Sequence, residues 1–124
     1  RRNGYRRLFA IKGSGRLEKL NVPAMGRQVQ GLFQPVPLMQ LDAFVLNLIL
    51  CQGTGPLWQY QDQSSLVFCY DGQTVLETPG GRTALGQGEL AVVPAGVAHR
   101  VVSPHRAVLL GLERRRPPDL PLPD

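Results

Sequence analysis

The chain has 124 residues, of which 43% are hydrophobic, and it carries a formal net charge of +5. This length and apolar fraction allow one domain with a buried core and exclude a wholly disordered chain. The arginines gather near the two ends, and the nearly neutral middle has no aromatic residues interleaved with Lys or Arg, so the sequence argues against a nucleic-acid partner.

The first forty residues have no sustained helical or alternating period. We treat residues 1–40 as an irregular arm that could add one or two edge strands, around residues 5–11 and 27–33. Residues 41–113 form the expected barrel, and residues 114–124 form an extended, proline-rich tail. No apolar run is long enough to cross a bilayer, and no signal segment opens the chain. We therefore expect no membrane association and a cytoplasmic location.

From residue 41 onward, short apolar runs alternate with Gly- and Pro-rich turns. The expected strands lie, in order, in AFVLNLILC, SLVFCYD, GQTVLET, RTALGQG, ELAVVP, AHRVVS and RAVLLGLE. The Asp-Gly pair inside SLVFCYDGQTVLET predicts a hairpin, and SPHRA predicts a turn with His105 facing solvent. Strand after strand at close intervals indicates an all-β barrel or double-sheet roll.

One turn in this region carries a specific spacing, in the stretch GELAVVPAGVAHR. Gly88 turns the chain into a strand, Pro94 ends the pairing of that strand, and Gly96 permits the reversal. His99 then enters the next strand and points inward. This G-x5-P-x-G-x2-H spacing resembles the second motif of the cupin family.

The resemblance to small single-domain cupins runs from about residue 41 to residue 113. It implies an all-β, cupin-type double-stranded β-helix, that is, a jelly-roll barrel. Cupins are often dimeric and typically hold one divalent metal on two or three histidines and a carboxylate.

The first cupin motif is degenerate in this chain. If its last glycine is Gly72, its ligand positions fall on Trp58, Tyr60 and Ser65, or in the other register on Gln59 and Gln61. Neither register supplies a histidine or a carboxylate, and Asp62 lies in the connection. We therefore expect no metal and no other cofactor, because about three protein ligands are needed. The alternative is one divalent metal such as Fe, Mn, Ni or Zn on His99, with Asp62, Cys69 or Gln61 as further ligands.

The residues around His99 predict a ligand pocket in place of the metal site. Its expected lining is Trp58, Tyr60, Ser65, Val67, Cys69 and His99. The hydroxyls of Tyr60 and Ser65 and the imidazole of His99 would be polar groups in an apolar barrel, which is typical of small-molecule sites. Cys51 and Cys69 are expected as buried free thiols. A catalytic Cys69–His99 pair lacks an orienting third group and oxyanion donors.

Three functions remain open. The first is a cupin-like barrel that binds a small, partly apolar organic ligand without catalysis. The second is a metal-dependent cupin enzyme, a dioxygenase or isomerase, that uses His99 with unconventional ligands. The third is a structural or dimerisation module with a filled barrel. We also expect a homodimer, because the strand AFVLNLILC is apolar on both faces apart from Asn47, and its outer face needs a cover from the arm or a second subunit.

Overall fold

The structure is a computed structural model and describes residues 11–12 and 17–114. The strand predicted around residues 5–11 falls outside the described residues except at its last position, and residues 115–124 of the tail fall outside them entirely. The strands are β1 (Ile11–Lys12), β2 (Val36–Leu41), β3 (Phe44–Thr54), β4 (Ser65–Asp71), β5 (Gln73–Thr78), β6 (Gly81–Gly86), β7 (Leu90–Val93) and β8 (Arg100–Arg114). The described residues contain one helix, α2 (Val22–Gln28).

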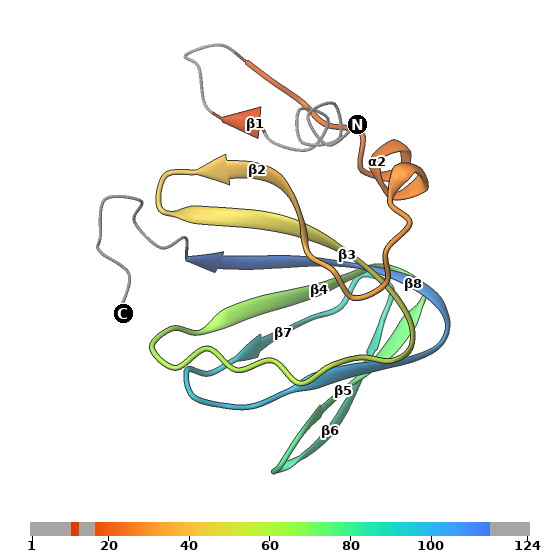
Figure 1. Cartoon of the computed structure of the whole chain (residues 1–124), viewed down its shortest axis with the longest axis vertical. Coiled ribbons are helices and arrows are strands. Elements are labelled where there is room, and N and C mark those ends of the chain that lie inside the picture. The colour runs from red at the N-terminus through yellow and green to blue at the C-terminus, as the bar shows by residue number, and fades with distance from the viewer. Residues whose placement is uncertain (1–10, 13–16, 115–124) are drawn as a thin grey trace.

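The strands follow the order β1-β2-β3-β8-β4-β7, and the β5–β6 hairpin joins this sheet through β5 and β8 (Figure 1). All pairs are antiparallel except β1 with β2. The 15-residue β8 pairs with β3, β4 and β5, so most of the sheet is organised around it. The predicted all-β class is confirmed.

The central strands are apolar on both faces, and a separate hydrophobic cluster packs on each face. Side chains that point into the barrel form one core cluster, namely Ile49, Cys51, Val67, Cys69, Leu76, Leu85, Val93, Val101, Ala107 and Leu109. Side chains on the outer face of β2, β3 and β8 form a second cluster with Met25 and Val29 from α2 and its C-terminal cap. The outer face of AFVLNLILC is therefore covered by the N-terminal arm of the same chain.

The arm contains a short helix, which includes only residues 27 and 28 of the strand predicted around residues 27–33. Asn21 caps α2 by accepting a hydrogen bond from the backbone N–H of Ala24 at 2.9 Å, and a proline occupies the first turn. Gly26 lies over Leu48, so the backbone of the helix approaches the sheet closely. The part of this segment that pairs with the barrel is an isolated bridge between Leu32 and Leu50. Among the described residues, no helix is long and apolar enough to cross a membrane.

The hairpin predicted at Asp71–Gly72 is wrong. The two flanking strands, β4 and β5, do not pair with each other; they pair with successive parts of β8, as one bent strand. Gly72 has φ +89°, and a Cβ there would lie 2.9 Å from the carbonyl oxygen of Arg106. Asp-Gly therefore supplies a positive φ for a bend against β8, not for a chain reversal.

The turn predicted in SPHRA is also wrong, because β8 continues through it. Residues 104–106 have no ladder partner on β3, β4 or β5, so Pro104 removes no sheet hydrogen bond there. The hydroxyl of the buried Ser103 lies close to the carbonyl oxygens of Gln73 and His105 and ties this irregular stretch to β5. His105 is exposed, as predicted.

Candidate functional site

The turn between β7 and β8 has the conformation that its spacing predicts. Gly88 and Gly96 have φ +89° and +80°, in the region that favours glycine, and Pro94 directly follows the last residue of β7. His99, the residue before β8, is only 2% exposed. The turn therefore buries the imidazole inside the barrel.

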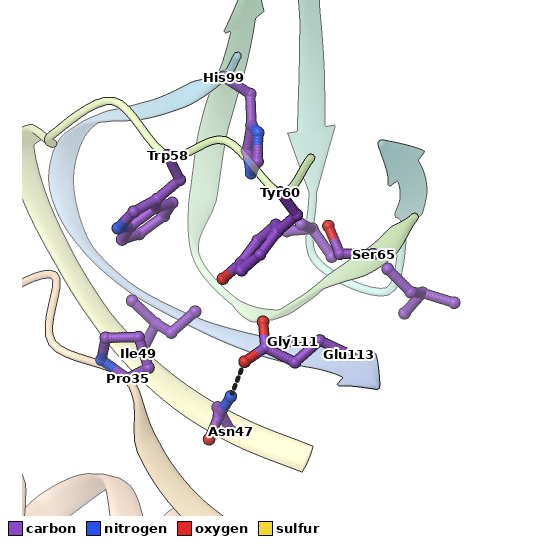
Figure 2. A pocket seen from close by; sticks show the side chains of 11 residues that line it. Pro35, Asn47, Ile49, Trp58, Tyr60, Ser65, His99, Gly111 and Glu113 are labelled. Carbon is purple, nitrogen blue, oxygen red and sulfur yellow. Dashed lines mark hydrogen bonds between the residues drawn. The ribbon is translucent and has the colours of Figure 1, made fainter. Parts of the chain in front are cut away.

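Four hydrogen bonds fix residues 58–60 against this turn. Trp58 and His99 exchange backbone hydrogen bonds of 2.8 and 2.9 Å. The N–H of Gly96 donates to the carbonyl of Tyr60 at 2.7 Å, and the side chain of Gln59 donates to the carbonyl of Gly96 at 2.8 Å. The rings of Trp58 and Tyr60 are thereby held 6.0 and 6.2 Å from the imidazole, between centroids (Figure 2).

A small cavity lies beside these rings, with a volume of about 30 Å³. Its lining is Pro35, Asn47, Ile49, Trp58, Tyr60, Ser65, Leu66, Val67, His99, Gly111 and Glu113. Five of the six residues predicted for the pocket are among them, and Cys69 is not. The space is enough for a water-sized group and not for a whole organic molecule.

Cys69 lies deeper in the barrel, in the apolar core. Its thiol contacts the backbone oxygens of Asp71 and Gly72, at 3.7 and 3.3 Å. Burial, followed by the charge of Asp71, raises the pKa of the Cys69 thiol. Burial and the neighbouring Cys69 raise the pKa of Cys51 to about 12. Neither thiol has the lowered pKa of an activated nucleophile, so the structure gives no support to a catalytic Cys69–His99 pair.

Two polar residues of the cavity are absent from the predicted lining. The amide of Asn47 on β3 donates a 3.4 Å hydrogen bond to the carboxylate of Glu113 on β8. Gly111 lies opposite Asn47, and a Cβ there would come within 3.5 Å of Ile49, so the missing side chain helps to leave the space open. The signal that could have found this pair is Asn47 itself, the one polar residue in the apolar run AFVLNLILC.

The hydroxyl of Tyr60 also faces Glu113, as Figure 2 shows. Burial, a hydrogen bond with Glu113 and the charge of that carboxylate all raise the pKa of Tyr60. The phenol is therefore neutral near pH 7 and can donate its proton in a hydrogen bond to the carboxylate.

The donor set does not fit the metal that cupins typically hold. Within the ranges that the structure describes, no three His, Cys, Asp or Glu side chains gather closely enough to bind an ion. Of the described residues, the cavity lining offers one imidazole, from His99, and one carboxylate, from Glu113. The Nδ1 of His99 lies 3.1 Å from the carbonyl oxygen of Val97, which only accepts, so Nδ1 carries a proton. Asp62 and Gln61 are exposed and do not line the cavity.

No family model matches the chain, and no curated protein matches it either. Solved structures do. A cupin-2 domain containing protein from Shewanella frigidimarina is 17% identical with a TM-score of 0.73, over 77% of this chain and 94% of that one. A hydroquinone 1,2-dioxygenase from Sphingomonas, with 4-hydroxybenzoate bound, is 18% identical with a TM-score of 0.69, over 78% and 74%.

A third similar structure is a sugar phosphate isomerase of the cupin superfamily from Silicibacter pomeroyi, which is 24% identical with a TM-score of 0.57. The match covers 67% of this chain and 59% of that one. At such identities the likeness concerns the fold alone. The predicted cupin-type jelly roll is thereby confirmed. Because a dioxygenase, an isomerase and a cupin-2 domain containing protein share this fold, function has to be argued from the site.

Proposed function

We propose that this cupin-fold chain binds a small, partly apolar organic molecule at the cavity beside His99 and does not catalyse a reaction on it. The observation that carries the proposal is the convergence of five polar side chains at one point of a largely apolar barrel interior. Asn47, Tyr60, Ser65, His99 and Glu113 all line the cavity, together with apolar and aromatic side chains. A few placed polar groups in an apolar lining are typical of small-molecule sites.

The size of the cavity limits how such a ligand binds. Its volume of about 30 Å³ is far below the roughly 300–1,000 Å³ of sites that enclose a drug-sized ligand. We infer that a polar head group of a few atoms enters, while the apolar remainder lies on the rim. Pro35 on that rim is exposed, and Trp58 and Tyr60 are half-buried.

The same small volume favours a second candidate, a structural module whose barrel is filled. A ligand screen distinguishes the binding site from the filled module. Small polar organic molecules are added, and the ¹H–¹⁵N NMR signals of the Trp58 indole and the Gly111 amide report whether they bind. Binding compounds should shift both signals, and Gly111→Val, which places a side chain in the cavity, should abolish the shifts. Gly80→Ala, in the exposed β5–β6 turn, is the control and should retain them. A screen in which no compound moves either signal would establish the filled module.

The absence of catalysis rests on the donor set, because a single imidazole and a single carboxylate fall short of the three protein ligands of catalytic metal sites. We expect the purified protein to carry no stoichiometric transition metal. Elemental analysis tests this directly. About one Fe, Mn, Ni or Zn per chain, lost on replacing His99, would overturn the proposal in favour of a metal-dependent enzyme.

We also propose that the chain forms a homodimer through the outer face of β4 and β7. The arm covers β2 and β3, but Leu90 and Val92 on β7 are 55% and 61% exposed, beside the half-buried Phe68 on β4. A second copy fits this face because the same uncharged apolar surface is self-complementary across a two-fold axis. Val92→Lys should halve the mass measured by light scattering. A wild-type protein that is already monomeric at micromolar concentration contradicts the proposal.

A further inference from the structure

We propose that the cavity recognises an ammonium group, so that its ligand is a small organic cation, a primary or methylated amine on a short apolar chain. The inference rests on the proposed function, because it concerns the same cavity, and it names the chemical class of the ligand. Three observations support it. The contacts of Glu113 are with neutral groups, aromatic rings form one wall of the cavity, and the residues of the lining disfavour anionic and neutral ligands.

Glu113 is a carboxylate whose contacts are with neutral groups. Its neighbours in the cavity are the Asn47 amide, at 3.4 Å, and the neutral phenol of Tyr60. Both ion pairs found among the described residues use a different carboxylate, that of Glu77, with Arg82 and Arg100. The half-buried negative charge of Glu113 therefore meets donors but no cation within the described part of the chain. A ligand ammonium would supply the missing opposite charge.

The aromatic side chains that form one wall of the cavity also favour an ammonium group. Trp58 and Tyr60 stand on one side of the cavity, and the carboxylate of Glu113 lies below the Tyr60 hydroxyl (Figure 2). The faces of indole and phenol rings attract cations electrostatically, and sites for methylated ammonium groups combine such rings. A cation placed here would contact π-systems on one side and a carboxylate on the other.

The lining disfavours the other ligand classes. Among the described residues it contains no lysine or arginine, so a carboxylate or phosphate ligand would meet Glu113 without a compensating cation from that part of the chain. A neutral alcohol could donate to Glu113, but it would leave the charge unpaired. The cavity volume of about 30 Å³ limits the buried head to a few atoms, which an ammonium or methylammonium group satisfies.

Three compounds of equal length test the charge preference: n-butylamine, butan-1-ol and butyrate at pH 7. NMR titration followed at the Trp58 indole and the Gly111 amide gives each dissociation constant. We expect butylammonium to bind about tenfold more tightly than butanol, because a charge-assisted hydrogen bond replaces a neutral one, and we expect no saturable binding of butyrate. N-Methylbutylammonium, whose head still fits the size limit, should also bind better than butanol because the rings contact its methyl group.

Variants locate the preference on Glu113. Glu113→Gln keeps a side-chain oxygen that can accept from Asn47 and Tyr60 but removes the charge, so it should bring butylammonium down to the affinity of butanol. The control Asp62→Asn removes an exposed carboxylate that lies outside the cavity, and it should leave the preference intact. Should Glu113→Gln not fold, Trp58→Leu tests the aromatic wall and should weaken binding of the methylated cation most.

The outcomes separate the two proposals. If butanol binds as tightly as butylammonium and Glu113→Gln changes neither, the cation inference is overturned while the binding function stands. If butyrate binds best, the inference is overturned in the same way. If no compound of any charge shifts the two signals, both proposals fall and the filled barrel is correct. Preferential binding of the cations that disappears in Glu113→Gln supports both.

Discussion

The two ends of the barrel interior lie on the same inner face of the same strands, yet one is a sealed core and the other a polar cavity. At the sealed end, Cys51 pairs with Ala107 and Cys69 with Leu109, and all four are 0% exposed. At the other end, four residues further along β3 and β8 from the Cys51–Ala107 pair, Asn47 lies opposite Gly111. The polar cavity thus differs from the sealed core in its side chains, while the backbone pairing of the strands stays the same.

This comparison shows which end of the barrel contributes most to the stability of the fold. Apolar burial at the sealed end contributes to folding in proportion to the area removed from water. The cavity end holds a carboxylate, an amide, two hydroxyls and an imidazole, whose desolvation is offset only by the hydrogen bonds that they form. Residues at the two ends should therefore respond differently to the same kinds of perturbation.

Thiol reactivity should show the largest contrast. Cys51 and Cys69 are fully buried with raised pKa values, so a small methanethiosulfonate reagent should modify them only through unfolding, roughly a thousandfold or more slowly than a free thiol. Ser65→Cys places a thiol of similar shape on the cavity lining and should add one faster-reacting equivalent per chain. Mass spectrometry against time gives both rates. Rapid modification of the two native thiols would show that the sealed end is open.

Removal of core volume should give the next largest effect. Leu109→Ala leaves a void among side chains that are fully buried, and we expect it to lower the free energy of unfolding by about 2–5 kcal/mol. Ser65→Ala, at the cavity end, should cost no more than about 1 kcal/mol. Urea denaturation followed by tryptophan fluorescence measures both values. Equal losses for the two variants would contradict the contrast between the ends.

Replacement of the buried imidazole should have a smaller effect on stability. His99→Gln keeps polar atoms near the carbonyl oxygen of Val97, so the variant should fold with a loss of about 1 kcal/mol or less and an altered ligand affinity. Melting temperature and the NMR titrations described above report the two quantities separately. A variant that fails to fold would assign His99 to the core and not to the site.

The smallest effect concerns stability at high pH. The pKa of Tyr60 is raised in the folded state above its ordinary value of 10.0, so folding favours the protonated phenol. This contribution is complete below pH 10 and declines as the pH rises through that value, because the unfolded chain then loses the proton first. Tyr60→Phe should therefore lose less stability than the wild type between pH 9.5 and 11, on the order of a few tenths of a kcal/mol.

Local signals in the sequence predicted the features that depend on local backbone conformation. Gly88, Pro94 and Gly96 specify a turn by themselves, which is why the burial of His99 could be predicted. Strand periodicity also placed Ser65, Val67 and Cys69 on one inner face. It could not tell how deep each lies in the barrel, and Cys69 proved to belong to the sealed end.

The errors concern partners that are distant in the sequence. Asp71 and Gly72 signal a positive φ equally well for a hairpin and for a bend, and the choice depends on β8, more than thirty residues later. Glu113 was missed because its role appears only when β8 lies beside β3, and the hydrogen bond with Asn47 spans 66 residues. The helix α2 was missed because its seven residues gain their stability from packing on the sheet rather than from propensity.

The position of β8 in the middle of the sheet has a consequence for synthesis on the ribosome. Strands β3, β4 and β5 all pair with residues 100–114, which are made after them. Strands β3 and β4 therefore emerge without their main partner, and β5 has only β6 to pair with. Their apolar faces stay exposed until β8 has been synthesised and the barrel can close. During that interval the nascent chain exposes aggregation-prone edges, and its yield in a cell should depend on chaperones that hold unfolded apolar segments.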